Sequence, residues 1–96
     1  MSVLLPRDVI TAGSGAEFRA LLKRVREHAG LSGGQVALIS GIDRKVVYRL
    51  GYARVSNLPP NRDQVEAYLK ACRLAPELLS LVMDLWAALE QAGVRS

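Results

Sequence analysis

Residues 31–54, LSGGQVALISGIDRKVVYRLGYAR, contain the signals that decide the predicted fold. Ser32 is followed three residues later by Gln35, which is the capping-box pattern of a helix start. Gly41 is a typical residue for ending that first short helix. Asp43 is then a good N-cap for a second helix, where its negative charge also suits the helix dipole. The stretch therefore predicts two short helices joined by a tight turn.

The first five residues, LSGGQ, also match the signature pentapeptide of ABC transporter ATPases. A chain of 96 residues is one domain, too short for a nucleotide-binding ATPase, and it has no GxxxxGK[ST] loop to hold phosphates. The helix cap at Ser32 explains the pentapeptide better. No Ser/His/Asp, Cys/His or paired-carboxylate set is visible either, so we expect neither enzymatic activity nor a cofactor or metal ion.

A second capping box, from Ser14 to Glu17, predicts a longer helix that runs to about Ala29. Its apolar residues recur at the spacing of one buried face: Phe18, Leu21, Leu22, Val25 and Ala29. We expect its other side to carry four solvated cations: Arg19, Lys23, Arg24 and Arg26. In the next helix the expected apolar side consists of Val36, Ala37 and Ile39.

Two more helices are predicted after the loop 54–60. Asn61 caps the first of them, whose buried face would hold Val65, Tyr68, Leu69 and Cys72. Pro76 stands at the first position of the last helix, where its missing N–H has no cost. Leu78, Val82, Leu85 and Leu89 suffice for one buried face there, and four further apolar residues widen it: Leu79, Leu81, Met83 and Trp86. Either this is a central core helix, or those four form a dimer or partner surface.

No segment alternates with the period of a strand, so the expected fold is all-α, with five helices in residues 16–96. Residues 1–15 are predicted to form an N-terminal arm with two apolar pairs, Leu4-Leu5 and Val9-Ile10. The sequence leaves open whether this arm is disordered or lies across the body or a partner. His28, Cys72, Tyr68 and Trp86 are expected to serve a helix end or the core rather than a ligand site.

The composition indicates a folded protein of the cytoplasm. Half of the residues are hydrophobic, no apolar run approaches the roughly 20 residues of a membrane span, and Cys72 has no second cysteine to pair with. The net charge of +4 is uneven: residues 31–60 carry four basic side chains against one acidic, whereas residues 61–96 carry four basic against five acidic. This field would attract phosphate groups, although a merely solvated basic face is the alternative.

Residues 17–74 resemble the helix-turn-helix domain of the Xre/Cro/phage-repressor family, especially the small actinobacterial type of regulator. The resemblance is carried by the residues Leu31-Ser32, Val36-Ala37, Gly41-Ile42, Arg44, Val47, Arg49, Leu50, Pro59-Pro60, Val65 and Leu69. It implies a lambda-repressor-like fold and a homodimeric, nucleoid-associated transcriptional regulator. The helix at about residues 43–52 would lie in the major groove of double-stranded DNA.

By position, the resemblance implies which side chains meet the DNA. Base edges would be contacted by Arg44, Lys45 and Arg49, since Arg or Lys to guanine is the commonest specific contact. Backbone or accessory contacts would come from Tyr48, Tyr52, Arg54, Arg24 and Arg26.

Three residues depart from the family's pattern. Gly33 replaces a Gln that usually helps to grip the phosphate backbone, and Asp43 replaces a capping Ser or Thr. The glycine that usually follows the recognition helix is replaced near Ala53. A rival interpretation therefore stays open, namely a protein-interaction module on the same fold. Its partner, such as a sigma factor, a toxin or a larger regulator, would bind through the N-terminal arm or the last helix.

Overall fold

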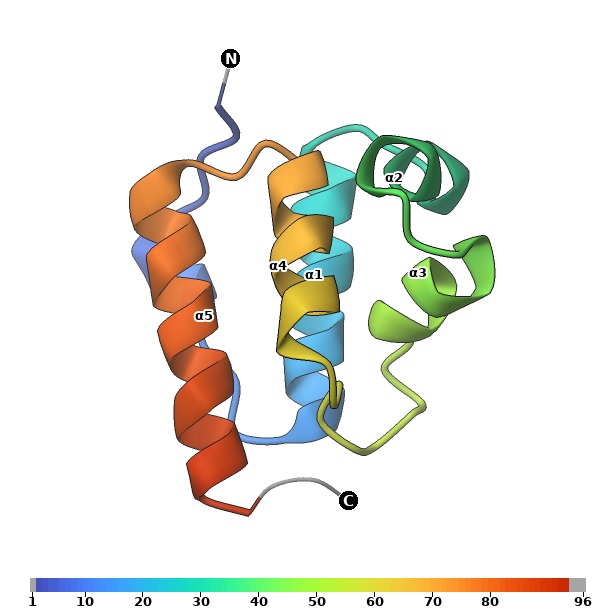
Figure 1. Ribbon diagram of the computed structural model, residues 1–96. Helices are drawn as coiled ribbons and strands as arrows, with labels where there is room; N and C mark the ends of the chain where they lie inside the picture. Colours follow the sequence, from blue (N-terminus) through green and yellow to red (C-terminus); the bar gives the residue numbers. More distant parts are fainter. Residues whose placement is uncertain (1, 94–96) are drawn as a thin grey trace.

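The computed structural model describes residues 2–93, which form five α-helices and one short 3₁₀ helix (Figure 1). In chain order these are η1 (Arg7–Val9), α1 (Gly15–His28), α2 (Gly33–Ser40), α3 (Arg44–Leu50), α4 (Arg62–Ala71) and α5 (Pro76–Gln91). Within the described range there is no strand, and Val3 and Leu74 form one isolated parallel bridge. The prediction of an all-α chain with five helices is confirmed.

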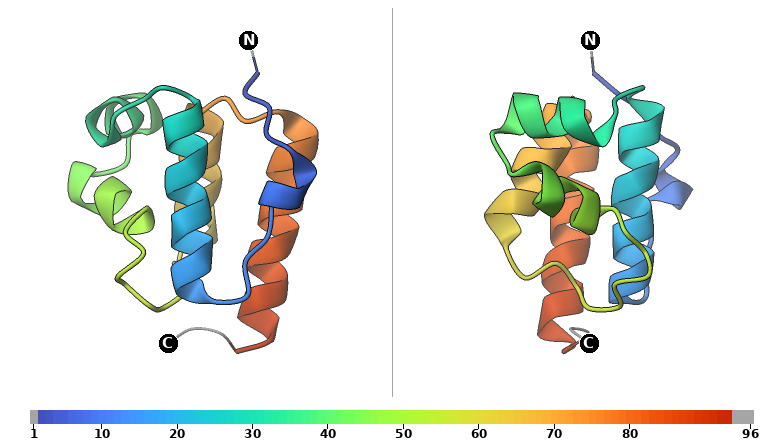
Figure 2. Two further views of the ribbon diagram at one scale, coloured as in Figure 1. Left: turned by 180° about the vertical axis from the view of Figure 1, so that it is seen from behind. Right: turned by 90° about the vertical axis from the view of Figure 1, so that its right-hand side faces the viewer.

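The helices lie in three layers. Helices α1 and α4 stand in the middle, α5 covers one side of them, and the α2–α3 pair covers the other side (Figures 1 and 2). Phe18 and Leu22 of α1 meet Tyr68 and Leu69 of α4 in a core where all four are fully buried. The Tyr68 hydroxyl donates to the Leu22 carbonyl at 3.0 Å, so this polar group is satisfied inside the core.

The predicted helix starts are confirmed by their hydrogen bonds. The side chains of Ser14, Ser32, Asp43 and Asn61 each accept from a backbone N–H in the first turn of the helix that follows. At Ser32 the box is complete, because the Gln35 side chain also accepts from the Ser32 N–H. These caps follow from sequence spacing alone, which is why they could be predicted.

The N-terminal arm crosses the back of the molecule between α1 and α5 (Figure 2). The Val3 N–H donates to the Arg73 carbonyl at 2.6 Å, and the Ala75 N–H donates to the Val3 carbonyl at 2.9 Å. The Leu5 side chain is buried, and Val9 packs against the core. Of the arrangements that the sequence left open, the structure shows the arm lying across the body of the same chain.

Helix α5 is a core helix. Met83 and Trp86, two of the four residues predicted to form a dimer or partner surface, are buried within the chain, so that prediction is wrong for them. Trp86 also donates its indole N–H to the Pro59 carbonyl at 2.8 Å, which fixes the loop before α4. Leu79 and Leu81, the other two, are half-buried and pack against the core.

Helix α2 has a narrower buried face than predicted. Val36 is fully buried, but Ile39 is 58% exposed and its neighbour Leu38 is 85% exposed. Because α2 has only eight residues and packs mainly on α3 and α4, its outer side stays exposed. None of the helices within residues 2–93 is both long and apolar enough to cross a membrane.

Candidate nucleic-acid interface

Helix α3 is held by its N-terminal cap and by one buried face. The Asp43 side chain accepts from the Lys45 N–H at 2.8 Å, and Gly41 adopts the left-handed conformation, with φ of 76°, that ends α2. Val47 and Leu50 are buried against the rest of the chain. This anchoring leaves an outer face of exposed side chains: Arg44, Lys45, Tyr48 and Arg49.

The cations on this face have no carboxylate partner in the part of the chain that the structure describes. The ion pairs among residues 2–93 all lie on α4, where Arg62 meets Asp63 and Glu66, and Lys70 meets Glu66. Asp43, which is the acidic residue nearest in sequence, is engaged by the backbone of α3. The outer face of α3 therefore presents uncompensated positive charge to solvent.

A tyrosine ring fills the space in front of Gly33. A Cβ atom added at Gly33 would lie 2.6 Å from Cε1 and Cζ of the Tyr48 ring, so no larger residue fits there while the ring stays in place. The Arg44 guanidinium in turn lies 5.8 Å from the centre of the Tyr48 ring, in cation–π range. The glycine at position 33 is thus explained by the Tyr48 ring, which in turn lies close to the Arg44 guanidinium.

The sequence contains a signal for this packing, but the signal does not identify Tyr48. Two consecutive glycines, Gly33 and Gly34, open α2, where each costs roughly 1 kcal/mol relative to Ala. A glycine within a helix often indicates that a neighbouring group leaves no room for a side chain, and at Gly33 that neighbour is the Tyr48 ring. What the spacing along the chain does not reveal is which side chain of α3 comes that close.

Substituting Gly33 tests this packing. Gly33→Ala is expected to destabilise the chain by up to about 1 kcal/mol, because the cost of displacing the half-exposed Tyr48 ring exceeds the gain in helix propensity. The free energy of unfolding in urea measures the change. In a Tyr48→Ala background the obstacle is gone, so the same substitution should become neutral or stabilising. An equal loss in both backgrounds would contradict the contact between Gly33 and Tyr48.

Arg19 was predicted to be solvated, and this prediction is wrong. The side chain is 3% exposed, its Nε donates to the Asn57 carbonyl at 2.8 Å, and its Nη1 donates to the Arg49 carbonyl. Burial, and secondly the charge of Arg49, lowers the pKa of the Arg19 guanidinium below its ordinary value. Arg19 thereby connects α1 to the end of α3 and to the loop before α4. Hydrophobic spacing cannot find such a residue, because it treats every Arg as a surface residue.

The residues predicted to contact the DNA backbone lie in different parts of the structure. Tyr52 and Arg54 are exposed and line a shallow pocket of about 350 Å³ together with Lys23 of α1. Arg26 donates to the Leu31 carbonyl at 2.9 Å and so serves the turn before α2. The structure thus brings Lys23 beside Tyr52 and Arg54, and this residue was not among the predicted contacts.

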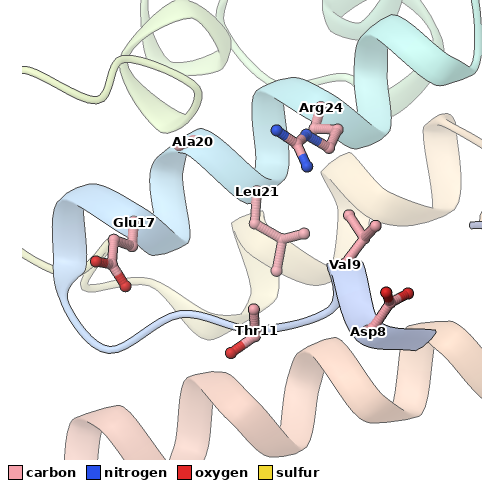
Figure 3. Close-up of a pocket in the computed structure, with 7 residues that line it drawn as sticks. All are labelled: Asp8, Val9, Thr11, Glu17, Ala20, Leu21 and Arg24. Carbon is pink, nitrogen blue, oxygen red and sulfur yellow. The ribbon is translucent and has the colours of Figure 1, made fainter. Parts of the chain in front are cut away.

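Arg24 lies on another side of α1. It lines a pocket of about 340 Å³ between α1 and the N-terminal arm (Figure 3). Asp8 and Glu17 line the same pocket and carry the opposite charge, with Val9 and Leu21 between them. This pocket is therefore not uniformly basic, and Arg24 is not grouped with the cations of α3.

The remaining polar candidates give no chemical site. Cys72 is fully buried, and burial raises the pKa of its thiol to about 11, so it stays a neutral core residue. His28 is exposed at the last turn of α1. Residues 2–93 contain no group of three or more His, Cys, Asp or Glu side chains that could hold a metal ion. A scan of protein-family models, a search of curated proteins and a search of solved structures each find no match to this chain.

Proposed function

We propose that this protein is a sequence-specific DNA-binding regulator of transcription, with α3 in the major groove. The observation that carries the proposal is the outer face of α3, where Arg44, Lys45 and Arg49 are exposed without carboxylate partners. A short helix fixed by a cap and a buried face suits the groove, which admits one helix. The proposal agrees with the resemblance to the Xre/Cro/phage-repressor helix-turn-helix family and places the protein on the nucleoid.

Each side chain has a role in this proposal. Lys45 and Arg44 contact base edges, and Tyr48 holds the Arg44 guanidinium in a restricted orientation. Arg54, with Lys23 and Tyr52 beside it, contacts the phosphate backbone at one edge of the groove. Homodimerisation on paired half-sites is part of the proposal, and it requires a surface other than the buried Met83 and Trp86.

Selection of bound sequences from a random duplex library tests the function. A defined motif is expected, and a palindrome would support the dimer. In binding assays, Lys45→Ala should lose about 1–3 kcal/mol of preference at one base position. Arg54→Ala should instead weaken all sequences alike and reduce the salt dependence by about one charge. No enrichment of any sequence, or no binding to DNA, would refute the proposal.

One observation favours a second candidate function, a protein-interaction module. Leu38 and Ile39 are adjacent apolar side chains on α2 that are largely exposed, and a partner protein bound to this helix would cover them. Elution from heparin discriminates the two functions. Release at high salt supports binding to DNA, whereas release at low salt supports the interaction module.

A further inference from the structure

A second pocket lies where the end of α3 meets the loop before α4. It has a volume of about 150 Å³, and its polar lining consists of Arg19, Arg49, Asn57 and Gln64. Val46 and Leu50 of α3 contribute apolar walls. No acidic residue lines it, so two cations and two neutral amides face a shared space.

The charge of Arg19 is buried without a counter-ion. Its oxygen partners, the carbonyls of Arg49 and Asn57 and the Asn57 side-chain oxygen, are all neutral. No carboxylate pairs with it within residues 2–93. A buried guanidinium without an opposite charge is costly, and a second cation beside it, Arg49, adds repulsion that is reflected in the lowered pKa of Arg19. An anion in the pocket would relieve both effects.

The pocket also has hydrogen-bond donors to offer. A guanidinium has five N–H groups. Arg19 donates three hydrogen bonds, two to Asn57 and one to Arg49, so two of its N–H groups remain. The Arg49 side chain makes no hydrogen bond or ion pair within the described chain and can offer its own fork of donors. Gln64 belongs to the first turn of the ten-residue α4, the positive end of that helix dipole.

We propose that this pocket binds a tetrahedral oxyanion, namely a phosphate group, between the guanidinium groups of Arg19 and Arg49. The group is supplied either by a DNA backbone lying along α3 or by a free phosphate ion. In the first case Arg49 contacts a phosphate rather than a base, and base reading falls to Arg44 and Lys45. The pocket itself does not depend on the proposed regulation of transcription.

Thermal unfolding of the full chain tests the pocket without DNA. The midpoint is measured in sodium phosphate and in sodium chloride at equal pH and ionic strength. Phosphate at about five times its Kd should raise the midpoint by about 4–8 °C over chloride. Arg49→Gln should abolish the rise. Lys45→Gln removes the same charge from an exposed position of α3 outside the pocket lining, and it should keep the rise.

A second measurement follows Arg19 itself. In ¹H–¹⁵N spectra the Arg19 Nε–H resonance should move on titration with phosphate in the wild type and in Lys45→Gln, and stay fixed in Arg49→Gln. No phosphate-specific rise in the wild type, or equal rises in both variants, would overturn the proposal.

Competition then identifies the source of the phosphate group. If a DNA phosphate occupies the pocket, inorganic phosphate weakens DNA binding more than chloride does at equal ionic strength, and Arg49→Gln removes the difference. If a free ion occupies it, stabilisation persists with DNA bound. A chain that responds to phosphate but binds no DNA would keep this pocket and refute the proposed function.

Discussion

Gly15→Ala is expected to destabilise the protein by about 2 kcal/mol or more. A Cβ atom at Gly15 would lie 2.3 Å from the Ser56 carbonyl oxygen and 2.5 Å from the backbone of Asn57 and Leu58. These are backbone atoms, and they cannot rotate away as a side-chain tip can. Helix propensity alone would predict that the same substitution stabilises the protein by up to about 1 kcal/mol. The sign of the measured change therefore shows whether the steric clash or the helix propensity dominates.

Gly34→Ala is the matched control. Gly34 also stands in the first turn of a helix, but its added Cβ would come no closer than 3.8 Å to the Arg44 guanidinium, which is ordinary contact. We therefore expect Gly34→Ala to stabilise the chain by about 0.5–1 kcal/mol. Urea unfolding measures both variants. A stabilising Gly15→Ala would show that the loop 52–61 does not rest on the start of α1.

The sequence predicts the local features of this fold well. Capping by Ser32, the end of α2 at Gly41 and the buried face of α4 all depend on residues within one or two turns of each other. These signals are physical at short range, since a cap needs only its own first turn. The all-α organisation of the chain follows from them.

Most of the missed features are contacts between segments that are distant in sequence. Arg19 meets Asn57 across 38 positions, and Trp86 meets Pro59 across 27. From the sequence, Arg19 on α1 looks like a solvent-exposed residue and Trp86 on α5 looks like part of a partner surface. Both are in fact buried against the loop before α4. The Tyr48 ring over Gly33 belongs to the same class, since it depends on how α3 crosses α2. The candidate site could be located from the sequence, but the residues that hold it in shape could not.

Arg19→Met is the second substitution with a large expected effect, a loss of about 2–3 kcal/mol in the free energy of unfolding. It removes the donor of the Asn57 carbonyl, and a buried acceptor without a partner costs about 1–3 kcal/mol. It also removes one of the hydrogen bonds to the Arg49 carbonyl, which keeps the Tyr52 N–H as a donor. Part of this cost is offset, because the buried and uncompensated charge of Arg19 disappears as well. Met preserves much of the apolar stem, so the loss reports the hydrogen bonds rather than a cavity.

Hydrogen exchange distinguishes a local role of Arg19 at the end of α3 from a general loss of stability. The Tyr52 N–H donates to the same Arg49 carbonyl as Arg19, so hydrogen exchange at Tyr52 should speed up more than exchange in α5. Arg24→Met removes the same charge from an exposed position of the same helix, and it should change the stability by less than about 0.5 kcal/mol. Equal effects of the two substitutions would mean that Arg19 acts through charge alone. A loss confined to Arg19→Met means that α1, through one buried guanidinium, sets the position at which α3 ends and hence the face that it presents.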